Sequence, residues 1–376
     1  MKKVKLGEVC EIVTGSTPKS TNPDYWNGEY KWITPAEISD DDFIIVDTQR
    51  KISKLGIEKT GLKSFPMGTV LLSSRAPIGK VAIAGCEMYC NQGFKNFICS
   101  NEINNEYLYY FLKSRKNFLN NIGRGATFKE ISKSIISNIE IILSSYDVQC
   151  TQTQNLKKID NLIYLRKKVI KEYQLLVKSR FNEMFGGNKQ FESIDNLFDI
   201  IDGDRGKNYP KSDELFDEEY CLFLNTKNVT KNGFSFITNQ FITETKDKLL
   251  RKGKLERYDI VLTTRGTVGN VAYYDESIKY KHLRINSGMV ILRPKKPNLN
   301  QKFIIHVLRN NNYSRVISGS AQPQLPITKL KKILLPLPPL SLQNEFTDFV
   351  AQVDKSQFAC QKAIKLWRNS LKSSII

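Results

Sequence analysis

The chain has 376 residues, which is enough for two or three domains with separate cores. Its 57 Lys and Arg exceed its 38 Asp and Glu and give a formal net charge of +19, while 40% hydrophobic residues exclude a disordered chain. No apolar run reaches ~18 residues, none follows the charged N-terminus, and the seven cysteines are scattered. We therefore expect a cytoplasmic protein with reduced thiols, no secretory signal and no membrane span. The positive surplus indicates a polyanionic partner, with nucleic acid before an anionic membrane surface.

Residues 1–145 predict a mixed α/β domain. Short apolar runs bounded by Gly, Pro, Asn and Asp predict strands at Thr69–Ser73, Lys80–Ala84 and Ile139–Leu143. Between the second and third of these runs, Glu106–Asn117 has the pattern of a helix.

Residues 146–186 predict one long helix. The stretch Tyr146–Phe185 contains neither Pro nor Gly, and the two glycines that follow it are a stop signal. Apolar residues recur every seven positions, which favours a left-handed coiled coil over a simple amphipathic helix. The seam consists of Leu156, Ile163, Ile170, Val177 and Met184, with Leu162, Val169 and Leu176 on its flank.

The rest of the chain follows the same plan, with a mixed domain over residues 187–340 and a helix over residues 341–376. Strands are predicted near Asp259–Thr263 and Met289–Leu292, and a helix near Gln301–Asn310. A proline-rich run precedes the second long helix. Its seam consists of Phe346, Val353, Cys360 and Trp367, with Val350, Ile364 and Leu371 beside them.

The second half of the chain repeats the first at an offset that drifts from 188 to 194 residues. Because the order is kept over nearly the whole chain, duplication of one ~190-residue unit explains the matches. The two long helices then pair most economically with each other, although each could instead cover only its own domain. The matches are Ile12–Gly15 with Ile200–Gly203, Val70–Ala82 with Ile260–Ala272, Ala126–Ile131 with Ala321–Ile327, and Ile139 and Gln149 with Ile333 and Gln343.

The positive charge is spread over folded segments and is not concentrated in a tail. The net charge is +4 for residues 1–145, +4 for 146–186, +9 for 187–340 and +2 for 341–376. Diffuse charge on two folded domains suits contact with nucleic-acid phosphates.

Patterns for catalysis and metal binding are missing. The two histidines, His282 and His306, lie far from the cysteine pair Cys86 and Cys90, so neither a metal site nor a histidine-based triad is predicted. There is no P-loop, and Asn22–Tyr25 departs from the amino-methyltransferase motif that it superficially resembles. These features speak against catalysis by this chain alone.

Several motifs stand in the duplicated order. They are Ser74–Gly79, its echo Thr264–Gly269, Ala321–Ile327 and the proline-rich Leu335–Gln343. Together with the alternation of mixed domain and heptad helix, they resemble the specificity subunit of type I restriction–modification systems over essentially the whole chain. The first copy of the last motif lacks the prolines, and Cys150 and Asn344 stand where the family usually has an acidic residue.

The resemblance implies an α+β fold with two mixed α/β target-recognition domains, related by an internal repeat and separated by two long antiparallel helices that form a coiled coil. Each domain would read one half of a bipartite double-stranded DNA target. The helices, ~54 Å for about 36 residues, would set the spacing and dock two methyltransferase (modification) subunits, which restriction and translocase subunits join. The resemblance implies neither a catalytic residue nor a cofactor on this chain, because S-adenosylmethionine, ATP and Mg²⁺ belong to the partners.

Candidate DNA contacts lie in three repeated settings. Arg75 and Arg265 follow equivalent strands beside a Gly, where an Arg either contacts a phosphate or a guanine or pairs with a carboxylate. The loop after a Gly turn in each domain holds basic and Gln side chains, which are suited to binding a phosphate or an adenine base. The alternative is that these side chains only face solvent. The loop candidates are Arg124, Thr127, Lys129, Gln322, Gln324 and Lys329.

Basic–aromatic clusters after equivalent strands form the third setting. Packing of the rings on their own domain is the alternative for Tyr25, Trp26 and Tyr209. The cluster candidates are Lys19, Tyr25, Lys31, Arg205, Lys207, Tyr209 and Lys211.

Two other functions fit the sequence. One is an autonomous two-headed DNA-binding or bridging protein, which would give a bipartite footprint and co-purify with nothing. The other is a self-contained DNA methyltransferase with an unrecognised cofactor motif, which would bind S-adenosylmethionine as an isolated chain.

Overall fold

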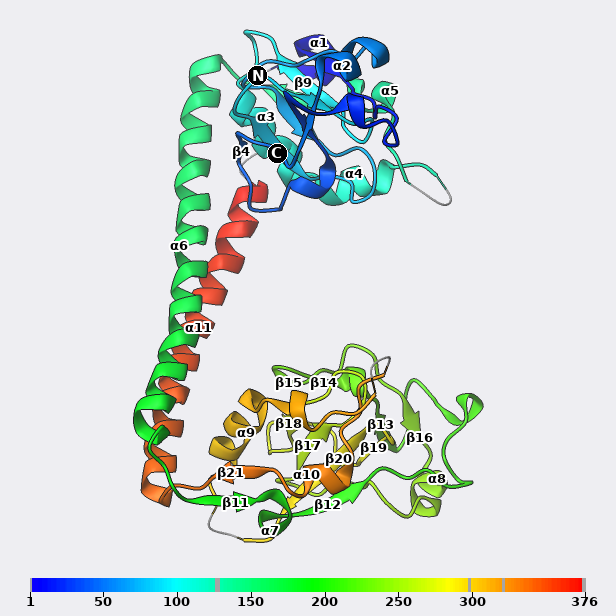
Figure 1. Cartoon of the computed structure of the whole chain (residues 1–376), viewed down its shortest axis with the longest axis vertical. Helices are drawn as coiled ribbons and strands as arrows, with labels where there is room; N and C mark the ends of the chain where they lie inside the picture. The colour runs from blue at the N-terminus through cyan, green and yellow to red at the C-terminus, as the bar shows by residue number, and fades with distance from the viewer. Residues whose placement is uncertain (1, 126–128, 297–298, 320–321, 374–376) are drawn as a thin grey trace. The chain divides into compact units, whose positions relative to one another are not determined.

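The computed structural model describes residues 2–125, 129–296, 299–319 and 322–373. The chain divides into two compact units. Unit 1 comprises Met1–Ile170 and Phe358–Ile376, and unit 2 comprises Lys171–Gln357. Each unit contains one mixed α/β domain, and two long helices, α6 (Tyr146–Phe185) and α11 (Leu340–Ser373), each contribute to both units (Figure 1).

Unit 1 is built on a five-stranded sheet whose two faces are both covered. Leu72 of the central strand lies in a core cluster with helix α3 (Asn105–Ser114), and Leu71 lies in a second cluster. Because successive side chains point to opposite faces, an uninterrupted apolar run serves both clusters. In sheet order the strands are β2 (Cys10–Val13), β9 (Asn96–Cys99), β6 (Val70–Leu72), β7 (Val81–Ala84) and β4 (Ile44–Ile45).

Smaller elements complete unit 1. A second sheet has the order β5 (Arg50–Ile52), β3 (Trp26–Ile33) and β8 (Tyr89–Cys90), and β1 (Lys2–Lys5) pairs with β10 (Glu140–Leu143). The short helices are α1 (Leu6–Val9), η1 (Pro23–Tyr25), η2 (Pro35–Glu37), α2 (Lys54–Thr60), α4 (Lys116–Ile122) and α5 (Lys133–Ser137).

Unit 2 has the same plan. Its main sheet has the order β12 (Phe198–Asp202), β20 (Met289–Pro294), β17 (Ile260–Thr263) and β18 (Val271–Tyr273). Beside it lie β16 (Phe241–Ile242), β13 (Cys221–Leu224) and β19 (Leu283–Ile285), and the pairs β11 (Phe191–Ser193) with β21 (Leu334–Pro336) and β14 (Val229–Thr230) with β15 (Gly233–Phe234). The remaining helices are α7 (Ile194–Leu197), η3 (Ser212–Glu214), η4 (Thr226–Asn228), α8 (Glu244–Leu249), α9 (Gln301–Asn310), η5 (Tyr313–Arg315) and α10 (Ile327–Leu330).

The elements predicted from sequence are found with small changes of boundary, and one helix is divided. The predicted strands correspond to β6, β7, β10, β17 and β20, and the predicted helix Gln301–Asn310 is α9. A single helix over Glu106–Asn117 is wrong, because the backbone leaves helical geometry at Arg115 and the chain continues as α4. This break lets Leu119 of α4 enter the same core as α3.

The two long helices run antiparallel, as predicted. In unit 2, Arg180 of α6 pairs with Glu345 of α11 at 2.8 Å, and in unit 1 Arg166 contacts Cys360 at 3.8 Å, so residue numbers fall on one helix as they rise on the other. Leu156, Ile163, Phe346, Val353, Cys360 and Ile364 are buried, and Ile170, Val177, Met184 and Trp367 are half-buried.

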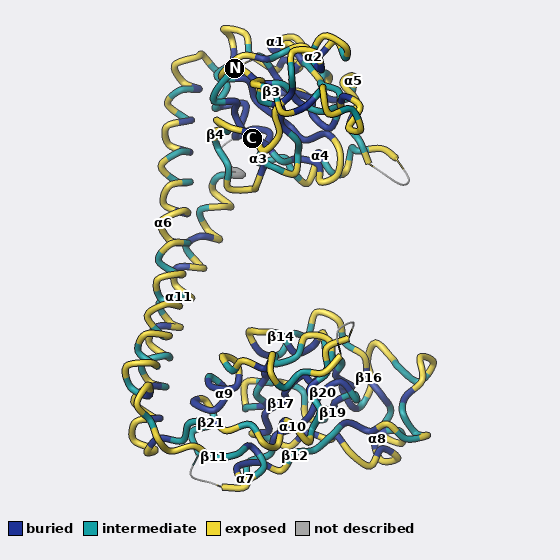
Figure 2. Tube along the Cα trace, viewed as in Figure 1, coloured by how far each residue is buried: buried dark blue, intermediate teal, exposed yellow. Residues whose placement is uncertain are grey.

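The flank and the ends of the long helices differ from the seam in burial and in what they contact. Exposed positions alternate with buried and half-buried ones along α6 and α11 (Figure 2). Leu162 and Leu176 are among the exposed ones, so the flank predicted there is wrong for these two residues. Leu156 and Phe346, near the helix starts, are also part of the domain cores. Each helix therefore both covers its neighbouring domain and pairs with the other helix.

A buried glutamine fastens each long helix to its domain. Gln149 accepts a hydrogen bond from the backbone N–H of Asn104 at 2.9 Å and donates to two carbonyls, those of Glu102 and Ser144. Gln343 likewise accepts from the N–H of Asn300 and donates to a carbonyl. The 194-residue match between these glutamines is thus a structural equivalence.

Replacing Gln149 by Ala is expected to lower the free energy of unfolding by about 1–3 kcal/mol, because one part-buried N–H and two part-buried carbonyls lose their partner. Urea unfolding followed by circular dichroism measures this loss. Gln154→Ala, an exposed position on the same helix, is the control. Equal unfolding midpoints for the two variants would contradict the role of Gln149.

Candidate nucleic-acid interface

Equivalent arginines stand at the ends of equivalent strands. Arg75 lies three residues after β6, and Arg265 lies two residues after β17. Both are in turns closed by a glycine of positive φ. Gly79 donates its N–H to Ser73 and Gly269 donates to Thr263, each at 3.0 Å. Only a residue without Cβ adopts this conformation freely, which explains the repeated Gly.

A second loop returns to each arginine. Glu130 pairs through its backbone with Arg75 and Arg124, and Gln324 pairs with Arg265 and Ser318 in the same way. The loops continue into matching contacts, because the N–H of Ile131 bonds Ser74 at 2.9 Å and that of Leu325 bonds Thr264 at 2.8 Å. Ile131 is therefore equivalent to Leu325, which corrects the alignment with Ile327.

Unit 1 compensates its arginine with a carboxylate. The Arg75 Nε donates to a Glu130 oxygen at 2.9 Å, and the Nζ of buried Lys95 lies 3.3 Å from the other oxygen. Burial raises the pKa of Glu130, but the hydrogen bonds from Arg75 and Lys95 outweigh it and hold this pKa below its usual value. Of the two interpretations offered by the sequence, the structure shows the pairing of Arg75 with a carboxylate.

Unit 2 has no such compensation. Gln324 occupies the position of Glu130, and the wholly buried Val290 of β20 occupies that of Lys95. The Nε of Arg265 is buried, and the guanidinium has no hydrogen-bond or ion-pair partner among residues 2–125, 129–296, 299–319 and 322–373. This cation is therefore available to an anion that the described residues do not supply.

The comparison with protein families is decisive at this point. Residues 1–174 and 188–366 match the type I restriction modification DNA specificity domain. The chain belongs to this family. The two matched segments correspond to the two halves of the internal repeat.

Relatives of the specificity-domain family match nearly the whole chain. The MjaIX type I restriction enzyme specificity subunit of Methanocaldococcus jannaschii is 29% identical over 96% of this chain and 88% of its own length. A solved structure concerned with complex assembly and conformational transition of the type I R-M system shares the fold, with a TM-score of 0.68, 17% identity and coverage of 100% and 96%. The type I restriction–modification S subunit from M. genitalium has a TM-score of 0.53 at 17% identity, with coverage of 100% and 96%.

Four of the six loop candidates in the two specificity domains are exposed. Arg124, Lys129, Gln322 and Lys329 have no side-chain hydrogen bond or ion pair within the described part of the chain. Gln324 is half-buried beside Arg265, and Thr127 lies outside the described residues. The exposed loop side chains can therefore reach a ligand without breaking an internal bond.

The basic–aromatic cluster of the first specificity domain divides into core and surface. Tyr25 packs against the cluster of Trp26 and Trp32, as the alternative interpretation stated. The Lys31 Nζ is held within its own domain, because it donates a hydrogen bond to the Val46 carbonyl. Of the three predicted contacts here, Lys19 is exposed, and Tyr25 and Lys31 are half-buried.

The second cluster divides in the same way. The Tyr209 ring lies 5.6 Å from that of Phe223, so it serves the core. Arg205 pairs with Asp202 at 3.1 Å and is exposed, as are Lys207 and Lys211. The lysines remain candidates for phosphate contact, whereas the tyrosine has a structural role.

Sequence reasoning missed Lys95 and Glu130. Lys95 stands between Phe94 and Asn96, close to Phe97, and a lysine among aromatic residues is a signal for a buried ion pair. Glu130 and Gln324 hold equivalent positions in the two halves of the repeat, and only Glu130 is charged. A correct alignment of the loops would have identified the difference between Glu130 and Gln324, whereas Lys95 lies outside the loops, directly before β9.

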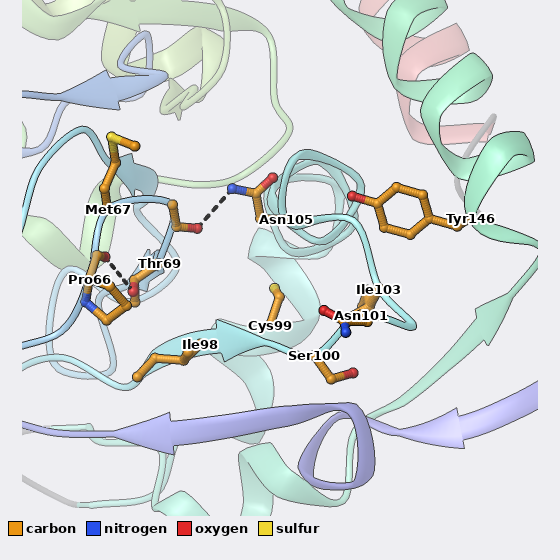
Figure 3. Close-up of a pocket in the computed structure, with 11 residues that line it drawn as sticks. Pro66, Met67, Thr69, Ile98, Cys99, Ser100, Asn101, Ile103, Asn105 and Tyr146 are labelled. Atoms are coloured by element: carbon orange, nitrogen blue, oxygen red, sulfur yellow. Dashed lines mark hydrogen bonds between the residues drawn. The ribbon is translucent and has the colours of Figure 1, made fainter.

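The other features of the structure do not form a competing site. A cavity of about 610 Å³ in unit 1 is lined by eleven residues, none of them charged, including Cys99, Asn105 and Tyr146 (Figure 3). Burial and nearby Arg309 lower the pKa of His306 to about 4, so its ring is neutral at pH 7. Among the described residues, no three His, Cys, Asp or Glu side chains lie close enough together to hold a metal ion. None of the helices in this part of the chain has the length and apolar character of a membrane span.

Proposed function

We propose that this chain is the non-catalytic DNA-recognition subunit of a type I restriction–modification complex, and that its two domains read the two halves of a bipartite target. The observation that carries the proposal is the repeated pair of loops around Arg75 and Arg265, each bordered by exposed basic or Gln side chains. Cations near an exposed loop hold the DNA backbone, and amide side chains distinguish base edges.

The long helices connect the domains and offer a surface to partners. Residues of α6 outside the seam remain exposed although they are apolar, as with Tyr164 at 63%, Leu165 at 45% and Leu175 at 58%. Exposed apolar side chains in one segment are typical of a protein interface. We infer that two modification subunits dock there and that restriction subunits join them in the cytoplasm. S-adenosylmethionine, ATP and Mg²⁺ would act on these partners.

Exchanging residues 1–145 for the corresponding domain of a relative is expected to change one half of the recognised sequence and to leave the other half and the spacer length unchanged. Each domain folds around its own core, so the exchange leaves the second domain intact. Selection of bound duplexes from a random library, with the modification subunits present, measures the result. Exchange of residues 187–340 is the matched control and should change only the opposite half.

Two outcomes would contradict the proposed function. A single continuous recognition sequence would exclude two separate reading domains. Specific binding of S-adenosylmethionine by the isolated chain would exclude a non-catalytic subunit.

A further inference from the structure

We infer that Arg265 is a phosphate-contacting cation of unit 2, and that Glu130 acts as a positioning residue that withholds the equivalent Arg75 from such a contact. The inference rests on the proposed function, because it takes DNA as the ligand. It goes further by assigning unequal roles to two arginines at equivalent positions of the repeat.

The two arginines start from the same backbone frame. In each unit the arginine pairs with the returning loop, and the residue before it accepts the N–H of the first buried residue after that loop, at 2.9 Å in unit 1 and 2.8 Å in unit 2. A difference in what the side chains bind therefore comes from the residues around them and not from the position of the turn.

In unit 1 a neighbouring carboxylate pairs with the arginine. Glu130 holds the Arg75 Nε at 2.9 Å, and buried Lys95 holds the carboxylate from its other side at 3.3 Å. The side chains of Arg75 and Glu130 are 45% and 35% exposed, so a phosphate that approached the arginine would also meet the carboxylate. The repulsion between the two anions offsets the attraction of the arginine.

In unit 2 the same two positions carry no charge. Gln324 replaces the glutamate and Val290 replaces the lysine, and the buried Nε of Arg265 has no partner in the described chain. A guanidinium presents five donors in a planar fork that matches a phosphate, and its charge persists at any working pH. A buried unpaired donor is uncommon in folded proteins. Arg265 as a whole is only half-buried, so its guanidinium can turn toward a ligand phosphate, which would supply the missing acceptor.

The first test compares Arg265→Ala with Arg75→Ala. Fluorescence anisotropy of the full chain with a labelled 40-bp duplex of random sequence, over a series of KCl concentrations, gives the slope of log K against log[salt]. Loss of one phosphate contact reduces the slope by about 1. We expect that reduction for Arg265→Ala, a much smaller change for Arg75→Ala, and retention of the slope by Arg265→Lys.

The second test exchanges the surroundings of the arginines. Gln324→Glu is expected to reproduce the loss of slope of Arg265→Ala, because it recreates the carboxylate of unit 1. The double variant Glu130→Gln/Lys95→Val recreates the surroundings of Arg265 around Arg75, so we expect it to increase the slope by about 1. A merely structural role of Glu130 predicts a loss and no gain. Thermal unfolding of each variant checks that it is folded.

The outcomes separate the inference from the proposed function. Equal losses from Arg75→Ala and Arg265→Ala, or an unchanged slope for Gln324→Glu, would overturn the inference. A loss from Arg265→Ala that appears only with one DNA sequence and leaves the salt slope unchanged would overturn the phosphate assignment. Absence of salt-dependent binding by the unmodified chain would instead contradict the proposed function.

Discussion

Replacing Phe346 by Ala is expected to lower the free energy of unfolding of unit 2 by about 3–5 kcal/mol. The side chain is wholly buried where three helices meet. Its ring lies 5.4 Å from Phe181 of α6, and 6.1 Å from Phe303 and 4.8 Å from His306, both of α9. Truncation leaves a cavity that rigid aromatic neighbours cannot fill, so the variant loses both apolar burial and ring contacts.

Phe358→Ala is the matched control for this prediction. Phe358 lies on the same helix α11 but is 68% exposed, so its truncation should change stability by no more than about 0.5 kcal/mol. Thermal and urea unfolding of the full chain measure both variants. Similar losses for the two phenylalanines would show that the three-helix junction does not stabilise unit 2.

Replacing Asp247 by Ala is expected to cost about 3–5 kcal/mol, because it leaves a buried arginine without its counter-ion. Asp247 of α8 binds the Nε of Arg284 at 2.8 Å, and the side chains are only 1% and 4% exposed. Lys254 binds the second carboxylate oxygen from the surface. The guanidinium also donates to the Lys252 carbonyl, so Arg284 cannot turn outward without breaking further bonds.

A double-mutant cycle separates this pair from its surroundings. Asp247→Ala/Arg284→Ala should be less destabilised than the sum of the single variants, with a coupling of about 0.5–3 kcal/mol. Asp217→Ala, an exposed aspartate in the same unit, is the control. Additive losses in urea unfolding would contradict a buried ion pair.

The same aspartate predicts a pH dependence. Burial raises the pKa of Asp247, but the hydrogen bonds from Lys254 and Arg284 outweigh it and leave this pKa below its ordinary value of 3.8. The folded state therefore binds fewer protons than the unfolded state, and the stabilisation is complete above the ordinary pKa and lost as the pH falls through the lowered one. Below about pH 4, stability should fall more steeply for the natural chain than for Asp247→Asn.

Local sequence patterns predicted most of the helices and strands. The strand β17 and the helix α9 end within one residue of their predicted limits, because apolar periodicity and capping residues act over a few neighbouring positions. Heptad spacing predicted the seam, the family resemblance implied its antiparallel direction, and the buried Gln149 and Gln343 confirm the repeat. The division at Arg115 was not predicted, because it depends on where Leu119 finds the core and no Pro or Gly marks it.

The sequence by itself determined a duplicated chain, its family, its long helices and the positions of two equivalent arginines. Only the tertiary structure decided that Arg75 is paired while Arg265 has no partner among the described residues. The bond between Arg75 and Glu130 joins residues 55 positions apart, and Lys95 reaches the same carboxylate from 35 positions away. Such pairing depends on how loops return to a sheet, and Coulomb energy depends on the resulting distances, which no local pattern in the sequence encodes.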